Sequence, residues 1–533
     1  MKVKKLSNKI IRRLMLCATG TLMACGLIAG AGATEADAAA KIPISSASDF
    51  QKIADNPKGS YYLTKDITLK NMEMMFPNTD DAPFSGTLDG NGHKIKYIYT
   101  SSGLSDYTWV TMFAKAEGAT FKNLSFSGVN VNIDAKDNPL AVAPLVMRPE
   151  KCRFENITAS GNITVRGNST KSDEAPSYQV SGLIGGTHTS VLKNCKSRLN
   201  INVKAELSSG VKVSGLSTSV DTLKDCSFSG KITAAARFCG ANNDYIASGL
   251  TGDAEKLNGC SNSGNITMTV KTGAPKAYPR TIGAYGLSGG DIETLTTPVV
   301  SCKNTGNIKA NAATLEYDVR AAGLIDTVHS GKKTSITKCS NTGKVSASGK
   351  GTACAAGIAL ETSIVDQCYN TGTVTANGNS GRAESQAGGL CGMVYQIKNC
   401  YNTGKISLKG SGCAGGLTAN IDIGMGNTTC NYATGKVSAT GSKINAANAC
   451  ILFKYSVGTE EYMKNKSMVF NNYYTGSGKP YGHLSPEPSV QKRNPKAKKV
   501  SSITSGNCPK LSSKYWTYSS KHKRLILKNN KEK

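Results

Sequence analysis

The chain has 533 residues, 39% of them hydrophobic, and a formal net charge of +28 at pH 7. A chain of this length can bury a large core without covalent staples. Two of its 17 cysteines lie in the first 40 residues, which leaves 15. Because an odd number of cysteines cannot all pair within one chain, the composition excludes a fully disulfide-stapled protein.

Residues 1–40 have the three parts of a secretory signal peptide. Basic residues lie within 2–13, an apolar stretch runs over 14–31, and three alanines end the segment at 38–40. This order is typical of a removed export signal rather than of a membrane span. We therefore expect cleavage near Ala33 or Ala40, and a protein that is secreted or held on the extracellular cell surface.

An alternative for this segment is lipidation, because Leu22 to Cys25 resembles a lipoprotein cleavage box. No later segment is apolar enough to cross a bilayer, and no Leu-Pro-x-Thr-Gly sorting motif is present. We expect no transmembrane helix in the mature chain, which would be soluble or peripherally attached.

The net charge indicates the class of partner. Six of the 64 Lys and Arg residues and two of the 36 Asp and Glu residues lie in the first 40, so the remainder carries +24. For an exported chain we expect an acidic polysaccharide, a wall polymer, or a host surface glycan or protein, and no nucleic acid. The alternative is that dispersed lysines only keep a large surface soluble.

A short helix is expected at the start of the mature chain. Ser48–Gln51 resembles a helix start with a capping box, and Phe50, Ile53 and Ala54 would form one apolar face. Such a helix would cover the first exposed sheet edge.

An internal repeat then occupies most of the chain. Five near-copies share a cysteine, an Asn-Ser/Thr-Gly corner and a following Ile or Val, and fainter copies bring the series to eleven units spaced 29 to 42 residues apart. The near-copies are Cys260–Ile266, Cys302–Ile308, Cys339–Val345, Cys368–Val374 and Cys400–Ile406.

A second signature, a glycine followed by Leu or Ile, precedes the central copies by about 20 residues. Each unit therefore has three fixed apolar points, namely this Leu or Ile, the cysteine, and the Ile or Val after the corner glycine. Short β-branched runs flank each point. We predict an all-β, right-handed, three-sided parallel β-helix of about eleven turns. The Gly-Leu or Gly-Ile pairs end at Leu183, Leu216, Leu250, Leu287, Leu324, Ile358, Leu390 and Leu417.

The cysteine column is expected to be interior. Seven cysteines fall in register from Cys195 to Cys400, and Leu124 and Ile157 hold the same place earlier, so cysteine acts there as a small hydrophobe. A metal site or a catalytic thiol is the alternative, but no second ligand pair at metal-binding spacing accompanies the column.

The Asn-Ser/Thr-Gly corner is expected to be structural as well. Its glycine would supply a positive φ, and the asparagines would hydrogen-bond from turn to turn. These asparagines are Asn262, Asn304, Asn341, Asn370 and Asn402.

The segments Gly59–Leu69 and Pro83–Ile95, with cores such as Gly182–Gly185 and Gly389–Gly392, resemble surface proteins that carry the bacterial GLUG repeat. The resemblance runs over roughly residues 42 to 476 and implies a parallel β-helix of the pectate-lyase-like class on a secreted or wall-associated protein. It implies little about activity. The zinc protease that sometimes accompanies these repeats is excluded, because no histidine begins a His-Glu-x-x-His motif.

We divide the mature chain into an N-terminal cap with the first turns (41–118), the β-helix repeats (119–478) and a C-terminal segment (479–533). That last segment has 14 basic and two acidic residues. Its start is expected to be a basic linker, and Tyr515–Tyr518 with Arg524–Leu527 a final strand pair that closes the coil. A wall-anchoring patch is the alternative.

The lengths of the repeats differ in one place, between the strand after the corner and the next Gly-Leu pair. These insertions would project from one edge and form a binding face. Tyrosine there offers a flat face on which a sugar ring can pack, and arginine can form bidentate hydrogen bonds to carboxylate or sulfate. The candidate ligand-binding residues are Tyr178, Arg237, Tyr245, Tyr278, Arg280, Tyr317, Arg320 and Arg382.

The sequence favours a non-catalytic binding or adhesion protein for glycans or wall polymers. One alternative is a polysaccharide lyase or glycoside hydrolase, for which Glu174, Asp244, Glu316 and Glu384 are the carboxylates in the insertions, although no paired-aspartate strand is evident. A structural spacer in the envelope is the other. We assign no catalytic residue, metal ligand or cofactor.

Overall fold

A computed structural model describes most of the chain from Ala40 to Glu532. The predicted signal peptide lies outside the described residues. The described ranges are 40–72, 83–104, 108–170, 175–238, 244–272, 281–292, 299–312, 317–328, 335–378, 385–422, 428–448, 450–453, 471–483 and 497–532.

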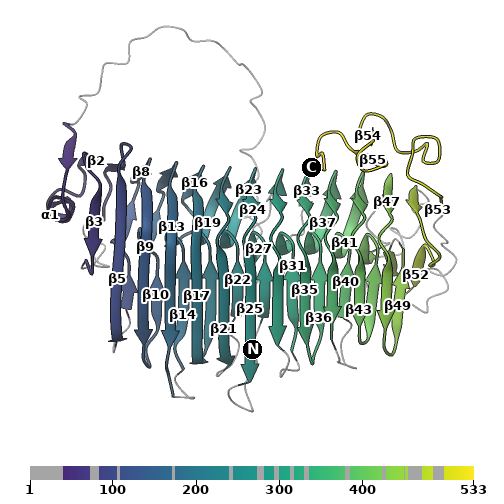
Figure 1. Ribbon diagram of the computed structural model, residues 1–533, viewed down its shortest axis with the longest axis horizontal. Helices are drawn as coiled ribbons and strands as arrows, with labels where there is room; N and C mark the ends of the chain where they lie inside the picture. The colour runs from purple at the N-terminus through teal and green to yellow at the C-terminus, as the bar shows by residue number, and fades with distance from the viewer. Residues whose placement is uncertain are drawn as a thin grey trace, which may run out of the picture. The chain divides into compact units, whose positions relative to one another are not determined.

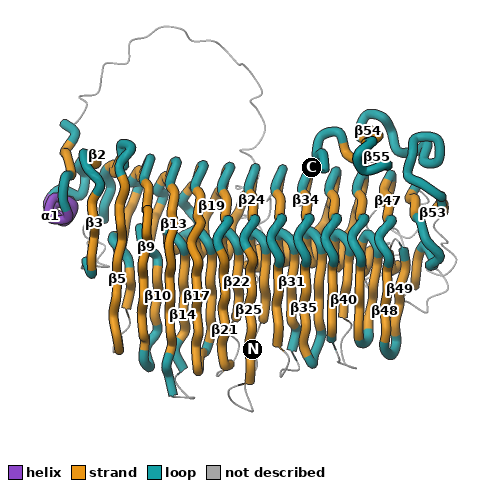
Figure 2. Tube along the Cα trace, viewed as in Figure 1, coloured by secondary structure: helices purple, strands orange, loops and turns teal. Residues whose placement is uncertain are grey.

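Residues 41–533 form one compact unit in which successive coils stack as a parallel β-solenoid. Each coil contributes to three parallel sheets, here called sheets 1, 2 and 3. Figures 1 and 2 show the strands of neighbouring coils side by side along the whole solenoid. The predicted all-β, three-sided parallel β-helix is confirmed.

Among the described residues, sheet 3 has 11 strands. The solenoid as a whole makes about nine turns, against the prediction of about eleven. The strands are β6 (Thr108–Val110), β10 (Leu140–Val142), β14 (Ser177–Ser181), β18 (Gly210–Ser214), β22 (Asp244–Ser248), β26 (Thr281–Tyr285), β31 (Val319–Ala322), β36 (Ala353–Ala356), β40 (Ser385–Gly388), β44 (Gly412–Gly415) and β49 (Ile444–Ala447).

Sheet 1 follows sheet 3 along each coil, after the Gly-Leu corner. The strands of sheet 1 that come first in each coil are β7 (Phe113–Glu117), β11 (Val146–Glu150), β15 (Ile184–Gly186), β19 (Ser217–Lys224), β23 (Thr251–Asn258), β27 (Ser288–Ile292), β32 (Ile325–Val328), β37 (Ala359–Asp366), β41 (Cys391–Lys398), β45 (Thr418–Asp422), β50 (Cys450–Phe453) and β52 (Tyr481–His483). The remaining strands are β1 (Ile42–Ile44), β2 (Ser60–Leu63), β4 (Thr87–Asp89), β8 (Thr120–Lys122), β12 (Arg153–Glu155), β16 (Val191–Lys193), β28 (Val299–Val300), β33 (Ser335–Thr337) and β46 (Thr428–Thr429).

Sheet 2 closes each coil and bends at the Asn-Ser/Thr-Gly corner. Its longer strands are β3 (Ile67–Lys70), β5 (Lys94–Leu104), β9 (Ser125–Ala135), β13 (Thr158–Gly167), β17 (Lys196–Ser208), β21 (Lys231–Phe238), β25 (Asn265–Thr272), β30 (Ile308–Ala312), β35 (Val345–Gly349), β39 (Val374–Asn377), β43 (Ile406–Lys409) and β48 (Val437–Thr440). Shorter strands before the corner are β20 (Ser227–Phe228), β24 (Ser261–Asn262), β29 (Lys303–Asn304), β34 (Ser340–Asn341), β38 (Tyr369–Asn370), β42 (Tyr401–Asn402), β47 (Asn431–Ala433), β51 (Asn472–Tyr474) and β53 (Ala497–Lys499).

The three predicted apolar columns all point into the core. The Leu or Ile of each Gly-Leu pair, the column cysteines and the β-branched residues after the corner are at most 1% exposed. Burial raises the pKa of the Cys302, Cys339 and Cys368 thiols well above the ordinary value. The pKa of the Cys260 thiol is instead lowered, because it hydrogen-bonds to its neighbours Cys226 and Cys302 in the column. Burial of every cysteine in the column confirms their interpretation as interior residues.

The corner asparagines form the predicted ladder. The side-chain amides of the first four asparagines donate to the carbonyl of the glycine two residues on and to the amide oxygen of the asparagine in the next coil. Asn402 donates to the Gly404 carbonyl, and its partner in the next coil is Ala433. The Asn341 Nδ2 to Asn370 Oδ1 distance is 2.7 Å. Because these side chains are buried, the ladder satisfies polar groups that water cannot reach.

The predicted reason for the corner glycine is wrong. Gly306 is not among the residues with positive φ; instead, a Cβ there would overlap the carbonyl oxygen of Gly264 in the preceding coil. Positive φ occurs earlier, at the residue before each column cysteine, such as Lys338 with φ of 55° and Asn399 with φ of 51°. The glycine therefore provides close approach between coils, and the sharp turn lies elsewhere.

The N-terminal helix α1 spans Ala47–Gln51 and is followed by a 3-10 turn over Lys52–Asp55. Its N-cap is Ser46 rather than the expected Ser48, since Ser46 Oγ accepts from Asp49 N at 3.1 Å. Phe50 and Ile53 are fully buried, as predicted, but Ala54 is exposed because it falls on the outer side of the turn.

The C-terminal segment contains the predicted strand pair, β54 (Trp516–Ser519) with β55 (Arg524–Leu527), but the pair does not close the coil. Figure 1 shows it beside the solenoid rather than beyond its last coil. Trp516 and Leu525 pack in one cluster with the outward-facing tyrosines of sheet 2. The physical reason is that these stacked rings offer a large apolar surface on the side of the solenoid.

That surface is a ladder of Tyr369, Tyr401, Tyr432 and Tyr473. The Tyr369–Tyr401 and Tyr401–Tyr432 ring centroids lie 5.0 and 4.9 Å apart, with nearly parallel planes. The Tyr432 hydroxyl donates to the Leu525 carbonyl at 2.6 Å. Tyrosine therefore occupies this outward position in the coils that the C-terminal segment covers.

Within the described ranges, no helix has the length and hydropathy required to cross a membrane.

We predict that Asn341→Ala lowers the urea midpoint of unfolding, at a cost of about 1–3 kcal/mol, because it leaves the ladder partners Asn304 and Asn370 without one hydrogen bond each. Asn377→Ala, at an exposed position, is the matched control. Equal midpoints for both variants would contradict a stabilising role for the ladder.

Candidate functional site

The predicted loop-edge site is only partly present. Tyr178 and Tyr245 are fully buried, so the prediction that their rings face a ligand is wrong. Tyr245 packs edge-to-face on Phe238 and its hydroxyl donates to the Ser208 carbonyl at 2.5 Å. Both tyrosines point inward because they occupy interior positions of β14 and β22, where an apolar ring gains more from burial than from solvent.

The arginines and remaining tyrosines differ in environment. Arg237 is exposed on β21, and Tyr317 is half-buried against the core. Arg320 is engaged by Asp326, with Nη2 and Nε at 2.7 and 2.9 Å from Oδ1, and so it is not free to grip a ligand anion. Tyr278, Arg280 and Arg382 lie outside the described residues, as do Glu174, Glu316 and Glu384.

A different hollow lies at the Gly-Leu corner, where the outer faces of sheets 3 and 1 meet. This concave groove has a volume of about 440 Å³ and is lined by five successive coils. Sheet 3 contributes outward-facing Gln179 and Lys212, and sheet 1 contributes small residues such as Ser219 and Gly252. The groove is lined by Gln179, Gly186, His188, Lys212, Val213, Ser214, Thr218, Ser219, Asp244, Ile246, Gly252, Asp253, Thr281, Gly289, Gly290 and Asp326.

Register explains why the groove is open. In sheet 3, Gln179, Lys212, Ile246 and Gly283 are direct partners in consecutive coils, and the next partner is Arg320. On the sheet 1 side, small residues leave the groove unfilled. One of them is Gly289, where a Cβ would overlap the Tyr285 ring. Small residues in these coils therefore leave a trough along the corner.

Charges in the groove are paired across coils. Lys212 Nζ lies 2.9 Å from Asp244 Oδ2, and His188 Nε2 lies 3.7 Å from Asp253 Oδ2. At the other end, Asp326 is 3% exposed. The Tyr285 hydroxyl donates to Asp326 Oδ2 at 2.6 Å, so the carboxylate is held rigidly.

Beside the groove, sheet 1 places two carboxyl groups in adjacent coils. Asp253 pairs with Ser219 in the strand register, which puts Glu255 next to Asp221. Burial, followed by the Asp221 carboxyl, raises the pKa of Glu255, and nearby His188 opposes the rise. A carboxyl group of raised pKa beside a second carboxyl group is a feature of sites that use a general acid.

The sequence analysis placed Asp244 among the carboxylates but missed Asp253, Asp326 and the Asp221–Glu255 pair. A signal was available, because aligning the repeats on the Gly-Leu pair puts Asp253 three residues and Glu255 five residues after Leu250. No set of three His, Cys, Asp or Glu side chains suitable for a metal ion occurs in the part of the chain that the structure describes. The groove can therefore hold hydroxylated ligands through paired charges and small polar groups.

No family model, no curated protein and no solved structure matches this chain.

We predict that Glu255→Gln stabilises the protein at neutral pH. A raised carboxyl pKa means that the folded chain holds this proton more tightly than the unfolded chain, so stability falls as pH rises above the ordinary value of 4.5. The gain in melting temperature should be present at pH 7 and vanish below pH 4.5.

The control is Glu206→Gln, because Lys204 lowers the pKa of Glu206. That variant should give no gain at pH 7. If the two variants behaved alike, the coupling of Glu255 to Asp221 would be refuted.

Proposed function

We propose that this protein is a secreted or cell-surface solenoid that binds glycans without catalysis, and that the concave groove is its binding site. The observation that supports the proposal is the open, polar groove of about 440 Å³ running across the coils. Open grooves with convergent polar groups are the usual places where extended ligands bind.

The chemistry of the groove favours a saccharide. Its lining offers amide, hydroxyl and carboxylate groups from residues such as Gln179, Thr218 and Asp253, which can accept and donate hydrogen bonds to sugar hydroxyls. The strands of successive coils lie about 4.8 Å apart and present these groups at regular intervals. Regular spacing suits a polymer that has a repeating unit.

The location and partner class rest on the sequence. Export would follow from the predicted signal peptide in residues 1–40, and the resemblance to GLUG-repeat surface proteins agrees with a role in adhesion or at the cell wall. The net charge of +24 over the remaining chain favours an acidic polysaccharide, wall polymer or host surface molecule over a neutral surface.

A second candidate function is glycoside hydrolysis. The raised pKa of Glu255 beside Asp221, with His188 close by, favours it. Hydrolysis of a glycosidic bond uses one carboxyl group as a general acid and a second as base or nucleophile.

We expect Ser219→Tyr to abolish glycan binding at the groove, because a ring at this half-exposed position would fill the groove without entering the core. Binding to a panel of purified bacterial and host oligosaccharides would be measured. Ser346→Tyr, a half-exposed outward position on β35, is the matched control and should bind as the wild type does. Undiminished binding by Ser219→Tyr would remove the groove from consideration.

Hydrolysis is tested with the same panel by following the release of reducing ends. Turnover that Glu255→Gln abolishes would replace the binding proposal with the second candidate. A spacer role predicts that deletion of two central coils leaves function intact, whereas a groove assembled from five coils should lose its ligand.

A further inference from the structure

A second hollow lies on a different face, between sheet 2 and the end of the chain. This tail cleft has a volume of about 440 Å³. One wall comes from three consecutive coils of the solenoid and the other from the last described residues of the C-terminal segment. It is lined by Ser301, Cys302, Lys303, Thr305, Lys338, Ser340, Thr342, Tyr369, Thr371, Asn530, Lys531 and Glu532.

The outer wall is fixed by hydrogen bonds to the backbone of the solenoid. Asn530 Nδ2 donates to the Cys339 and Gln367 carbonyls, both at 3.0 Å. Asn529 Nδ2 lies 3.5 Å from Gln367 Oε1. These contacts hold Lys531 over the coil that carries Ser340, so the cleft is a built feature of the folded chain.

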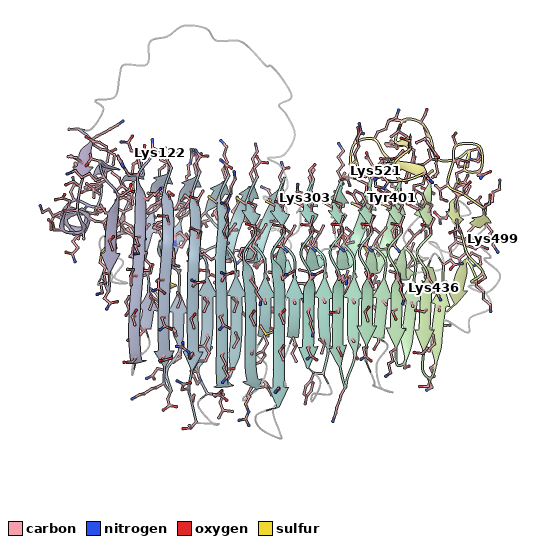
Figure 3. All side chains as sticks on the ribbon, in the orientation of Figure 1. Lys122, Lys303, Tyr401, Lys436, Lys499 and Lys521 are labelled. Carbon is pink, nitrogen blue, oxygen red and sulfur yellow. The ribbon has the colours of Figure 1, made fainter. Side chains whose placement is uncertain are left out.

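The cleft forms where the tyrosine ladder ends. Tyr369 is the ladder tyrosine nearest the N-terminus. The residues at the same register position in the two preceding coils are Ser340 and Lys303. A small side chain at 340 leaves room that a ring fills in the later coils. Figure 3 labels Lys303 and Tyr401 along this edge of the solenoid, and Figure 1 marks the C-terminus above it.

Three lysines surround the hollow. Lys303 is exposed on β29, Lys338 is half-exposed at the turn before Cys339, and Lys531 is exposed at the tail. Among the described residues, none of the three is within ion-pair distance of a carboxylate. Cations that line one hollow repel one another, and an anion between them relieves that repulsion.

Glu532 is the one carboxylate among the described lining residues, and it is already paired with a cation. Glu532 Oε2 lies 2.6 Å from Arg524 Nη2, and its other oxygen is 3.5 Å from His522 Nδ1. The Tyr401 hydroxyl donates to the same carboxylate at 3.0 Å. Glu532 therefore does not offset the positive charge of the three lysines. Its contacts hold the C-terminal segment against the solenoid instead.

The other lining groups fit a saccharide better than a nucleotide. Ser340, Thr342 and Thr371 offer hydroxyls that pair with sugar hydroxyls. The Tyr369 ring is only 4% exposed, so the cleft has no free aromatic face on which a base could stack.

We infer that the tail cleft binds the acidic group of an anionic polysaccharide, a carboxylate or a sulfate, between Lys303, Lys338 and Lys531. This site lies on another face from the groove and is independent of the proposed function, since it would stand if the groove bound nothing. Two of its lysines belong to the repeats and one, Lys531, to the C-terminal segment.

The test uses the chain from residue 41 to 533 and calorimetric titration with three trisaccharide probes. These are a galacturonate trisaccharide, a sulfated galactose trisaccharide and the neutral galactose trisaccharide. The wild type should bind at least one acidic probe and not the neutral one. A preference between the acidic probes identifies carboxylate or sulfate as the recognised group.

The cleft variant combines Lys303→Ser, Lys338→Asn and Lys531→Ser. Asn is chosen at 338 because the backbone there has φ of 55°, which asparagine tolerates. The matched control removes three charges from exposed positions on sheet 2 and its corner, with Lys309→Ser, Lys405→Ser and Lys436→Ser. We expect affinity to fall about tenfold or more in the cleft variant and to stay unchanged in the control.

Equal loss in both variants would show nonspecific charge attraction and overturn the inference, as would absence of binding by the wild type or equal binding of the neutral probe. Lys531→Ser alone, at an exposed tail position, covers the case in which the triple variant fails to fold, and it should weaken binding severalfold. The Ser219→Tyr groove variant should still bind the acidic probe at the tail cleft, and adding the three cleft substitutions to it should remove that binding, which separates failure of this inference from failure of the groove.

Discussion

The close approach of successive coils at the corner glycines determines the rest of the structure. At Gly306, and equally at Gly343 and Gly372, any Cβ would meet the carbonyl oxygen of the preceding coil. This contact sets the register, and the register places identical side chains above one another. The asparagine ladder, the buried cysteine column and the tyrosine ladder are consequences of that alignment, because each side chain meets its own kind in the next coil.

The same register builds both candidate sites. Where the outward residues are small, at Ser219 or Gly252, the concave corner between sheets 3 and 1 stays open. Where the tyrosine ladder gives way to Ser340, the C-terminal segment leaves a cleft beside it. Both candidate sites therefore lie where small side chains replace larger ones at the outward positions of successive coils.

The interior of the solenoid could be predicted from the sequence because the repeats can be compared position by position. Cys195 takes the place of Ile157 in the next repeat, which indicates an apolar, interior position, and both residues are buried. The outer surface could not be predicted in the same way. Tyr245 lies at the end of a variable insertion, yet alternation along β22 turns it inward. The carboxyl groups of Asp253 and Asp326 belong to different repeats, and only the stacking of coils brings them to one groove.

Hydrogen–deuterium exchange of the chain from residue 41 to 533, with and without its strongest oligosaccharide ligand, tests the central claim most directly. The account predicts slower exchange in peptides spanning 212–219 and 246–253, whose backbones form the groove, and no change in the strand Ile406–Lys409 on sheet 2. Protection confined to sheet 2, or absent from both groove peptides, would contradict the assignment of the concave groove as the glycan site.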